Sequence, residues 1–175
     1  MADKPNITPA RALETVRCNF PSASSELRDD FRDMLKSLAH HVRLEEYFAR
    51  TELRGVVSLI VAGESVRACR AVGDAARRVC DLPRVLPGDK ALGLAAALVE
   101  LAAVMEDPAE RVRLHKVIAY APACLLLEED ALGAMVTNPL LNTAFTWLDR
   151  LVALECAGAQ PSSFDDPEAM LVPAL

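Results

Sequence analysis

The segment at residues 91–105, ALGLAAALVELAAVM, constrains the fold more than any other part of this chain. It carries one charged residue, Glu100, in fifteen positions, so a helix formed by it has no polar face wide enough to lie on a surface. A helix that is apolar nearly all round is buried in the interior of a protein. We therefore expect a central helix that is covered on every side by the other helices of the chain.

The composition favours an all-α fold. Hydrophobic residues make up 52% of the 175 residues while aromatic residues make up only 5%, so a core built from Ala, Leu and Val is expected, and such residues suit closely packed helices. This length is typical of one domain. We predict a single-domain helical bundle of about seven helices over residues 1–157. Residues 158–175 contain three prolines and no apolar periodicity, which predicts an extended or disordered tail.

Proline residues mark three expected helix starts. Thr8-Pro9, Asp107-Pro108 and Asn138-Pro139 each place a side-chain acceptor at the N-cap and proline at the first helical position. Helices are therefore expected over residues 9–19, 108–127 and 139–156. In the second of these we expect Val112, Ile118 and Leu125 to face inward and Pro122 to kink or end the helix.

A long helix that begins near Ser24 or Ser25 has the clearest amphipathic pattern, and residues 65–80 and 130–136 are also expected to be helical. Residues 53–62 are rich in β-branched side chains and could form a strand on propensity alone, but the expected helices on both sides and the lack of a second strand favour a helix. The apolar face of the long helix comprises Leu27, Phe31, Met34, Leu35, Leu38 and Val42, and that of the last helix comprises Leu141, Ala144, Phe145, Leu148, Leu151 and Val152.

Charge and cysteine usage exclude several classes of protein. The net charge of −6 argues against nucleic-acid binding, because that affinity comes from Lys and Arg on phosphates. The five cysteines, Cys18, Cys69, Cys80, Cys124 and Cys156, include no Cys-x-x-Cys pair, so neither a disulfide framework nor a zinc site is predicted. Residues 1–13 lack an apolar signal segment, and polar residues interrupt the uncharged run 131–148. We expect a cytoplasmic protein without a transmembrane segment.

No catalytic, cofactor or metal signature is present. His41 and Glu45 stand four residues apart on a predicted helix, but no third ligand completes a metal site. His115 and a cysteine such as Cys124 could form a nucleophile pair for catalysis. Any sequence with several histidines and cysteines allows such a pairing by chance. Phosphate-binding and dinucleotide-binding loops are absent from the sequence. We therefore predict a protein that is not an enzyme and that has no cofactor.

One segment resembles a known family. The sequence Cys69-Arg70-Ala71-Val72-Gly73-Asp74-Ala75-Ala76-Arg77-Arg78 is similar to the third homology motif of the Bcl-2 apoptosis regulators, an amphipathic helix with apolar residues around a Gly-Asp pair. Cys69 stands where leucine is usual, and residues 89–93 do not reproduce the Asn-Trp-Gly-Arg that opens the central helix of that family. The resemblance implies that amphipathic helices surround one apolar helix.

The resemblance also implies a function and a set of partner-binding residues. We expect a regulator of cell death or innate signalling that binds an amphipathic partner helix in a hydrophobic groove. The expected partner-binding residues are Cys69, Val72, Gly73, Asp74, Arg77 and Arg78. Two alternatives are a subunit or adaptor that buries an apolar face against a partner or a second copy, and a small helical enzyme or ligand carrier with a pocket inside the bundle.

Overall fold

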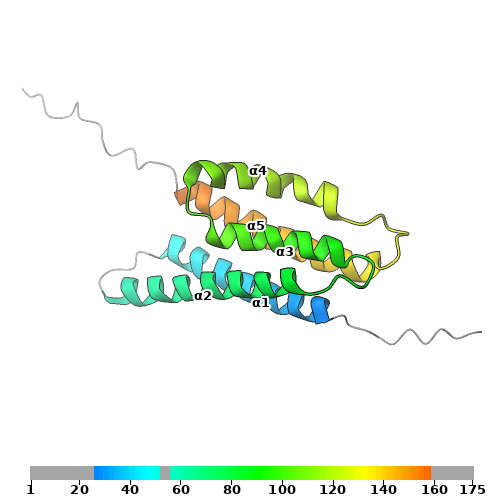
Figure 1. Cartoon of the computed structure of the whole chain (residues 1–175). Helices are drawn as coiled ribbons and strands as arrows, with labels where there is room; N and C mark the ends of the chain where they lie inside the picture. Colours follow the sequence, from blue (N-terminus) through cyan, green and yellow to red (C-terminus); the bar gives the residue numbers. More distant parts are fainter. Residues whose placement is uncertain (1–25, 52–55, 159–175) are drawn as a thin grey trace, which may run out of the picture.

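The computed structural model describes residues 26–51 and 56–158, and these form five α-helices without a strand (Figure 1). The helices are α1 (Glu26–Arg50), α2 (Val56–Asp81), α3 (Asp89–Val104), α4 (Pro108–Leu125) and α5 (Ala134–Gly158). Successive helices run in opposite directions, and one hydrophobic cluster takes residues from all five. The prediction of an all-α bundle is confirmed. The helix expected over residues 9–19 and the tail beyond residue 158 lie outside the described residues.

The described residues form fewer helices than the sequence predicts because two pairs of expected helices are continuous. Residues 56–62 and 65–80 belong to one helix, α2, since a single glycine, Gly63, costs a helix only about 1 kcal/mol and does not end it. Residues 134–136 and 139–156 both belong to α5. Pro139 is the sixth residue of α5, where it removes one hydrogen bond near the beginning of the helix.

The two described N-cap predictions have opposite outcomes. Asp107 caps α4 as expected, and its carboxylate accepts hydrogen bonds from the backbone N–H groups of Ala109 at 2.7 Å and Glu110 at 3.0 Å. The N-cap predicted at Asn138 is wrong, because α5 begins four residues earlier. The side-chain amide of Asn138 instead accepts from the N–H of Leu127 at 2.9 Å and donates to its carbonyl at 2.8 Å. Asn138 therefore holds the loop between α4 and α5.

Helix α3 is central, but the prediction that it is buried all round is wrong. It contacts each of the other four helices, and Leu92, Ala95, Ala96 and Val99 are fully buried. On its remaining side Leu94 and Leu101 are 43% and 42% exposed. The neighbouring helices thus leave one apolar stripe of α3 open to solvent.

The predicted apolar faces are correct for the longest helices and wrong in part for α4. All six predicted core residues of α1 are buried, as are five of the six in α5, with Val152 half-buried. In α4 Ile118 is buried and Leu125 is half-buried as expected, but Val112 is 56% exposed. The buried face of α4 consists of Leu114, Ile118 and Ala121. Pro122 lies one turn before the end of the helix, where its carbonyl accepts from the N–H of Leu126.

A buried carboxylate fixes the loop that leads into α3. Asp89 is fully buried and accepts from the backbone N–H groups of Val85 at 3.1 Å and Leu86 at 2.8 Å. Arg28 of α1 places its Nε atom 3.5 Å from this carboxylate and donates from Nη2 to the Pro87 carbonyl at 2.9 Å. These contacts connect the beginning of α1 to the beginning of α3.

Replacing Gly88 with alanine is expected to destabilise the fold. Gly88 has a φ of +90°, a left-handed conformation that costs an L-residue about 1–2 kcal/mol. An added Cβ would also lie 2.3 Å from the hydroxyl oxygen of Thr137, which must then move. Urea unfolding measures the loss. Gly63→Ala is the control, since nothing lies within 4 Å of a Cβ there, and it is expected to stabilise the helix.

Candidate functional site

An apolar groove lies between α3 and α4, beside the central helix. We call it the α3/α4 groove, and its volume is about 400 Å³. Its walls are Leu94 and Leu98 of α3 and, from α4, Lys116, Val117, Tyr120, Ala121, Cys124 and Leu125. Tyr120 is 73% exposed and Val117 is 51% exposed. The groove is therefore a surface feature with apolar walls.

The groove exists because α3 and α4 are both apolar on more than one face. Helix α4 turns Leu114, Ile118 and Ala121 toward the core, yet it also carries Val117 and Tyr120 on its outer side. Scattered exposed apolar residues are ordinary in a protein, but a contiguous apolar surface marks an interaction site.

Two basic residues of α4 lie at or near the groove. Among the described residues Lys116 is the one charged residue that lines it, and the exposed Arg113 lies three residues earlier on α4. Residues three and four positions apart share a helix face, so Arg113, Lys116 and Tyr120 lie along one side of α4. A partner with negative charge at this edge would be attracted.

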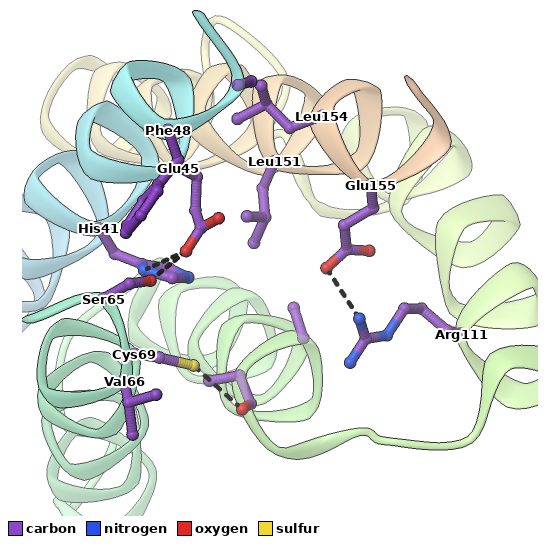
Figure 2. A pocket seen from close by; sticks show the side chains of 13 residues that line it. His41, Glu45, Phe48, Ser65, Val66, Cys69, Arg111, Leu151, Leu154 and Glu155 are labelled. Carbon is purple, nitrogen blue, oxygen red and sulfur yellow. Dashed lines mark hydrogen bonds and ion pairs between the residues drawn. The ribbon is translucent and has the colours of Figure 1, made fainter. Parts of the chain in front are cut away.

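A second hollow lies at the end of the bundle, and we call it the end cavity (Figure 2). Its volume is about 580 Å³ and all five helices contribute to its walls. The polar residues that line it are His41, Glu45, Ser65, Cys69, Arg111 and Glu155, and the apolar ones are Phe48, Ala49, Val66, Ala102, Ala103, Leu151 and Leu154. The end cavity shares no lining residue with the α3/α4 groove.

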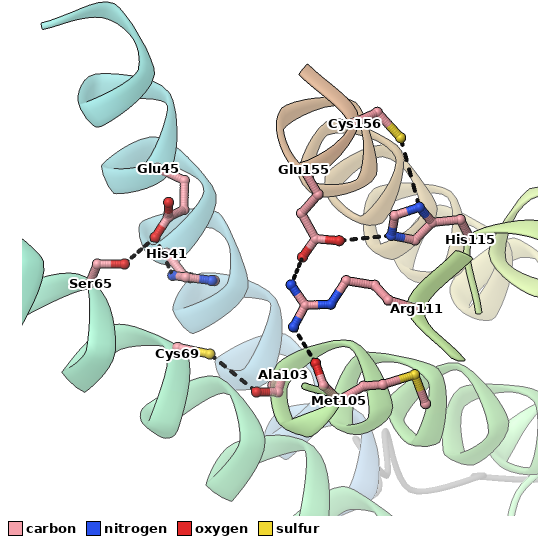
Figure 3. Close-up of polar contacts among 10 residues, drawn as sticks. All are labelled: His41, Glu45, Ser65, Cys69, Ala103, Met105, Arg111, His115, Glu155 and Cys156. Atoms are coloured by element: carbon pink, nitrogen blue, oxygen red, sulfur yellow. Dashed lines mark hydrogen bonds and ion pairs between the residues drawn. The ribbon is translucent and has the colours of Figure 1, made fainter. Parts of the chain in front are cut away.

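A polar network runs along one wall of the end cavity (Figure 3). The Glu155 carboxylate lies 3.4 Å from Nη1 of Arg111 and 2.7 Å from Nε2 of His115. Arg111 also donates from Nη2 to the carbonyl of Met105, which ties α4 to the end of α3. The thiol of Cys156 lies 3.8 Å from Nδ1 of His115. This wall is held in place by hydrogen bonds from three segments of the chain.

On the opposite wall, Ser65 of α2 donates its hydroxyl to Glu45 of α1. His41 lies one turn before Glu45, is only 7% exposed, and keeps its Nδ1 3.9 Å from the Glu45 carboxylate. That separation is too long for a hydrogen bond. Burial lowers the pKa of His41 from its ordinary value of 6.5, and the repulsion of His40 adds to this, although Glu45 and Glu155 act in the opposite direction.

The lowered pKa of His41 predicts a loss of stability in acid. Below about pH 6.5 the unfolded chain binds a proton at this residue that the native protein does not, so the free energy of unfolding falls as the pH decreases. Urea unfolding from about pH 7.5 to 5.5 measures the slope. His41→Gln is expected to reduce the slope, whereas His40→Gln, at an exposed neighbour that makes the smallest contribution to the shift, is expected to retain most of it. An equal slope in both variants would contradict this assignment.

The pair of His115 with a cysteine that was considered from the sequence is met by Cys156, whose Sγ lies 3.8 Å from Nδ1 of His115. Cys69 and Cys124 line the two hollows instead. Cys69 donates its thiol to the Ala103 carbonyl at 3.3 Å, and burial raises its pKa, with Glu45 and Glu155 adding to the effect. A reactive cysteine needs a lowered pKa. Cys124 lies in the α3/α4 groove, nine residues and about 13 Å along α4 from His115.

The six predicted partner-binding residues occupy several environments on α2, and none lines the α3/α4 groove. Cys69 lines the end cavity, whereas Val72 and Gly73 are buried. A Cβ on Gly73 would meet Ala103 at 3.7 Å, an ordinary contact distance, so the packing does not require glycine there. Asp74, Arg77 and Arg78 are exposed, and Arg77 binds Glu100 of α3 at 2.9 Å. The apolar residues of the motif thus pack within this molecule.

Sequence reasoning missed the groove face of α4 and most of the end cavity. His41 and Glu45 were noticed through their helical spacing, but nothing in the sequence connects them with Ser65, Arg111 or Glu155. Within residues 26–51 and 56–158, no three or more His, Cys, Asp or Glu side chains are grouped so that they could hold a metal ion. None of the five described helices combines the length and the apolar character needed to cross a bilayer.

Searches against protein-family models, curated proteins and solved structures found no match to this chain. The resemblance of residues 69–78 to a Bcl-2 motif therefore stays a sequence-based expectation, and the function has to be argued from the site itself.

Proposed function

We propose that this chain is a non-enzymatic regulatory protein that binds an amphipathic helix of a partner protein in the α3/α4 groove. The observation that carries the proposal is the apolar groove beside the central helix, with Leu94 and Leu98 on one side and Val117 and Tyr120 on the other. A helix that buries apolar residues at positions i, i+3, i+4 and i+7 fits such a groove.

Charge selects the kind of helix. Lys116 and Arg113 on α4 favour a partner that carries Asp or Glu beside its apolar face, because opposite charges steer association and set the register of the bound helix. Rim charges contribute more to orientation and association rate than to affinity. Most of the affinity is therefore expected from burial of Leu98, Val117 and Tyr120.

The biological setting that we propose is control of cell death or innate signalling. Its support is the resemblance of residues 69–78 to the Bcl-2 motif, together with the packing of α2 directly against the central helix α3. In this proposal the exposed Asp74, Arg77 and Arg78 form a second contact region on α2, separate from the groove.

The proposal can be tested with peptides. A displayed library of helical peptides is selected on the full chain, and affinities of the selected peptides are measured by fluorescence anisotropy. We expect binders with an apolar i, i+3, i+4, i+7 face and an adjacent acidic residue. Tyr120→Glu should weaken them about tenfold or more, since about 1.4 kcal/mol of lost burial suffices for that change. Leu132→Glu is the matched control, because Leu132 is 79% exposed and lies outside the groove.

The charge contribution is tested by reversal. Lys116→Glu is expected to weaken peptides that carry an acidic residue and to improve the same peptides with lysine at that position. Failure to select any helical peptide, or equal losses in Tyr120→Glu and Leu132→Glu, would contradict the proposal. Dimerisation that Tyr120→Glu abolishes would instead assign the groove to a second copy of the chain.

A further inference from the structure

The end cavity contains buried polar groups that have no hydrogen-bond partner among the described residues. Nδ1 of His41 and Nε of Arg111 are both buried, and neither is hydrogen-bonded within residues 26–51 and 56–158. Buried polar groups in native proteins are nearly always satisfied by protein, water or a ligand. His41 is 93% buried and lines the cavity, so the unsatisfied ring is placed to meet something that enters the cavity (Figure 2).

The charges that face the end cavity favour a cation. Glu45 reaches in from α1 and Glu155 from α5, on either side of Leu151 (Figure 2). Among the described lining residues Arg111 is the one permanent cation, and it pairs with Glu155, so two carboxylates face a single permanent positive charge. The lowered pKa of His41, caused first by burial, leaves its ring neutral near pH 7. Burial is also the main cause of the raised pKa of the Cys69 thiol, to which Glu45 and Glu155 add while Arg111 opposes them.

The remaining walls are hydrocarbon. Phe48, Val66, Leu151 and Leu154 offer apolar contact beside the carboxylates. The volume of about 580 Å³ is within the range of pockets that hold small organic molecules. A bare metal ion would leave these walls uncovered, and a fully apolar molecule would leave Nδ1 of His41 without a polar partner.

We infer that the end cavity is a binding site for a small organic ammonium ion, a primary amine with an aromatic or branched apolar body. The ammonium group lies between Glu45 and Glu155 and donates to them and to the unprotonated ring nitrogen of His41. The hydrocarbon body contacts Phe48, Leu151 and Leu154. This site is independent of partner binding in the α3/α4 groove, because the two share no lining residue.

Matched probes test this inference. Phenethylammonium, 2-phenylethanol and 3-phenylpropanoate have similar bodies and carry a positive, a neutral and a negative group. Each is titrated into the isotope-labelled full chain and followed by NMR. We expect saturable binding of phenethylammonium with amide shifts at His41, Ser65 and Cys69, and binding at least about tenfold weaker for the other two probes. Equal affinity for all three, tighter binding of the carboxylate, or no saturation by the amine would overturn the inference.

Isosteric variants locate the site. Glu45→Gln removes the charge but keeps a side-chain oxygen for the Ser65 hydroxyl, so the fold is expected to survive, and the NMR spectrum verifies this. The variant is expected to bind phenethylammonium about tenfold more weakly. Asp33→Asn removes one exposed carboxylate from the same helix, two turns before His41, and should bind as the wild type does. Unchanged affinity in Glu45→Gln would overturn the inference whatever the result at the α3/α4 groove.

Discussion

Replacing Leu92 with alanine is expected to lower the free energy of unfolding by about 2–5 kcal/mol, the range for deletion of a buried leucine side chain. Leu92 is completely buried on the core face of α3, and the four surrounding helices cannot all move inward to fill the space that the substitution leaves. Urea denaturation of the wild type and the variant measures the difference. Such a loss is a large part of the stability of a typical domain.

The control for this substitution lies two residues away. Leu94 is on the open side of α3 and is 43% exposed, so Leu94→Ala is expected to cost less than about 1 kcal/mol. Leu98 is half-buried and belongs to the α3/α4 groove, so its truncation should fall between the two. Equal losses at Leu92 and Leu94 would show that α3 does not present the faces described above.

Replacing Asp89 with alanine is expected to cost about 3–5 kcal/mol, the loss typical of breaking a buried ion pair from one side. The substitution removes the acceptor for two backbone N–H groups in the loop before α3. It also leaves the guanidinium of Arg28, which is 8% exposed, without this carboxylate. Thermal and urea unfolding should both report the loss.

Two further variants separate the contributions at Asp89. Asp89→Asn keeps an oxygen acceptor for the N–H groups of Val85 and Leu86 and removes only the charge, so a smaller loss is expected. Asp81→Ala removes an exposed carboxylate at the end of α2 and should change stability by no more than about 0.5 kcal/mol. If Asp89→Ala behaved like Asp81→Ala, the ion pair with Arg28 would not hold the loop.

Local features of the sequence predicted the parts of the fold that depend on a few consecutive residues. The apolar face of α1, from Leu27 to Val42, follows from helical periodicity, and every member is buried. The carboxylate of Asp107 caps α4 because its acceptor lies two and three residues from the N–H groups that it serves. Both features depend only on residues that are close to one another in the sequence.

Local features failed where packing competes with them. Pro139 follows an asparagine, a pattern typical of a helix start, yet α5 continues through this position. The side chain of Asn138 is hydrogen-bonded to the backbone of Leu127, eleven residues earlier, and does not cap a helix. Val112 was assigned to the core by its spacing, but α4 is apolar on two sides and the position of α3 and α5 decided which side is buried. Periodicity alone does not choose between two apolar faces.

The candidate sites also depend partly on local sequence and partly on how the helices pack. The sequence by itself determined an all-α chain with an apolar central helix, because helix formation and amphipathicity are encoded within three to four residues. Only the tertiary structure decided that α3 has an open side, that α4 forms a groove with it, and that His41, Arg111 and Glu155 face one cavity. Those residues are separated by up to 114 positions, and side chains so distant in the chain meet only when the helices have packed.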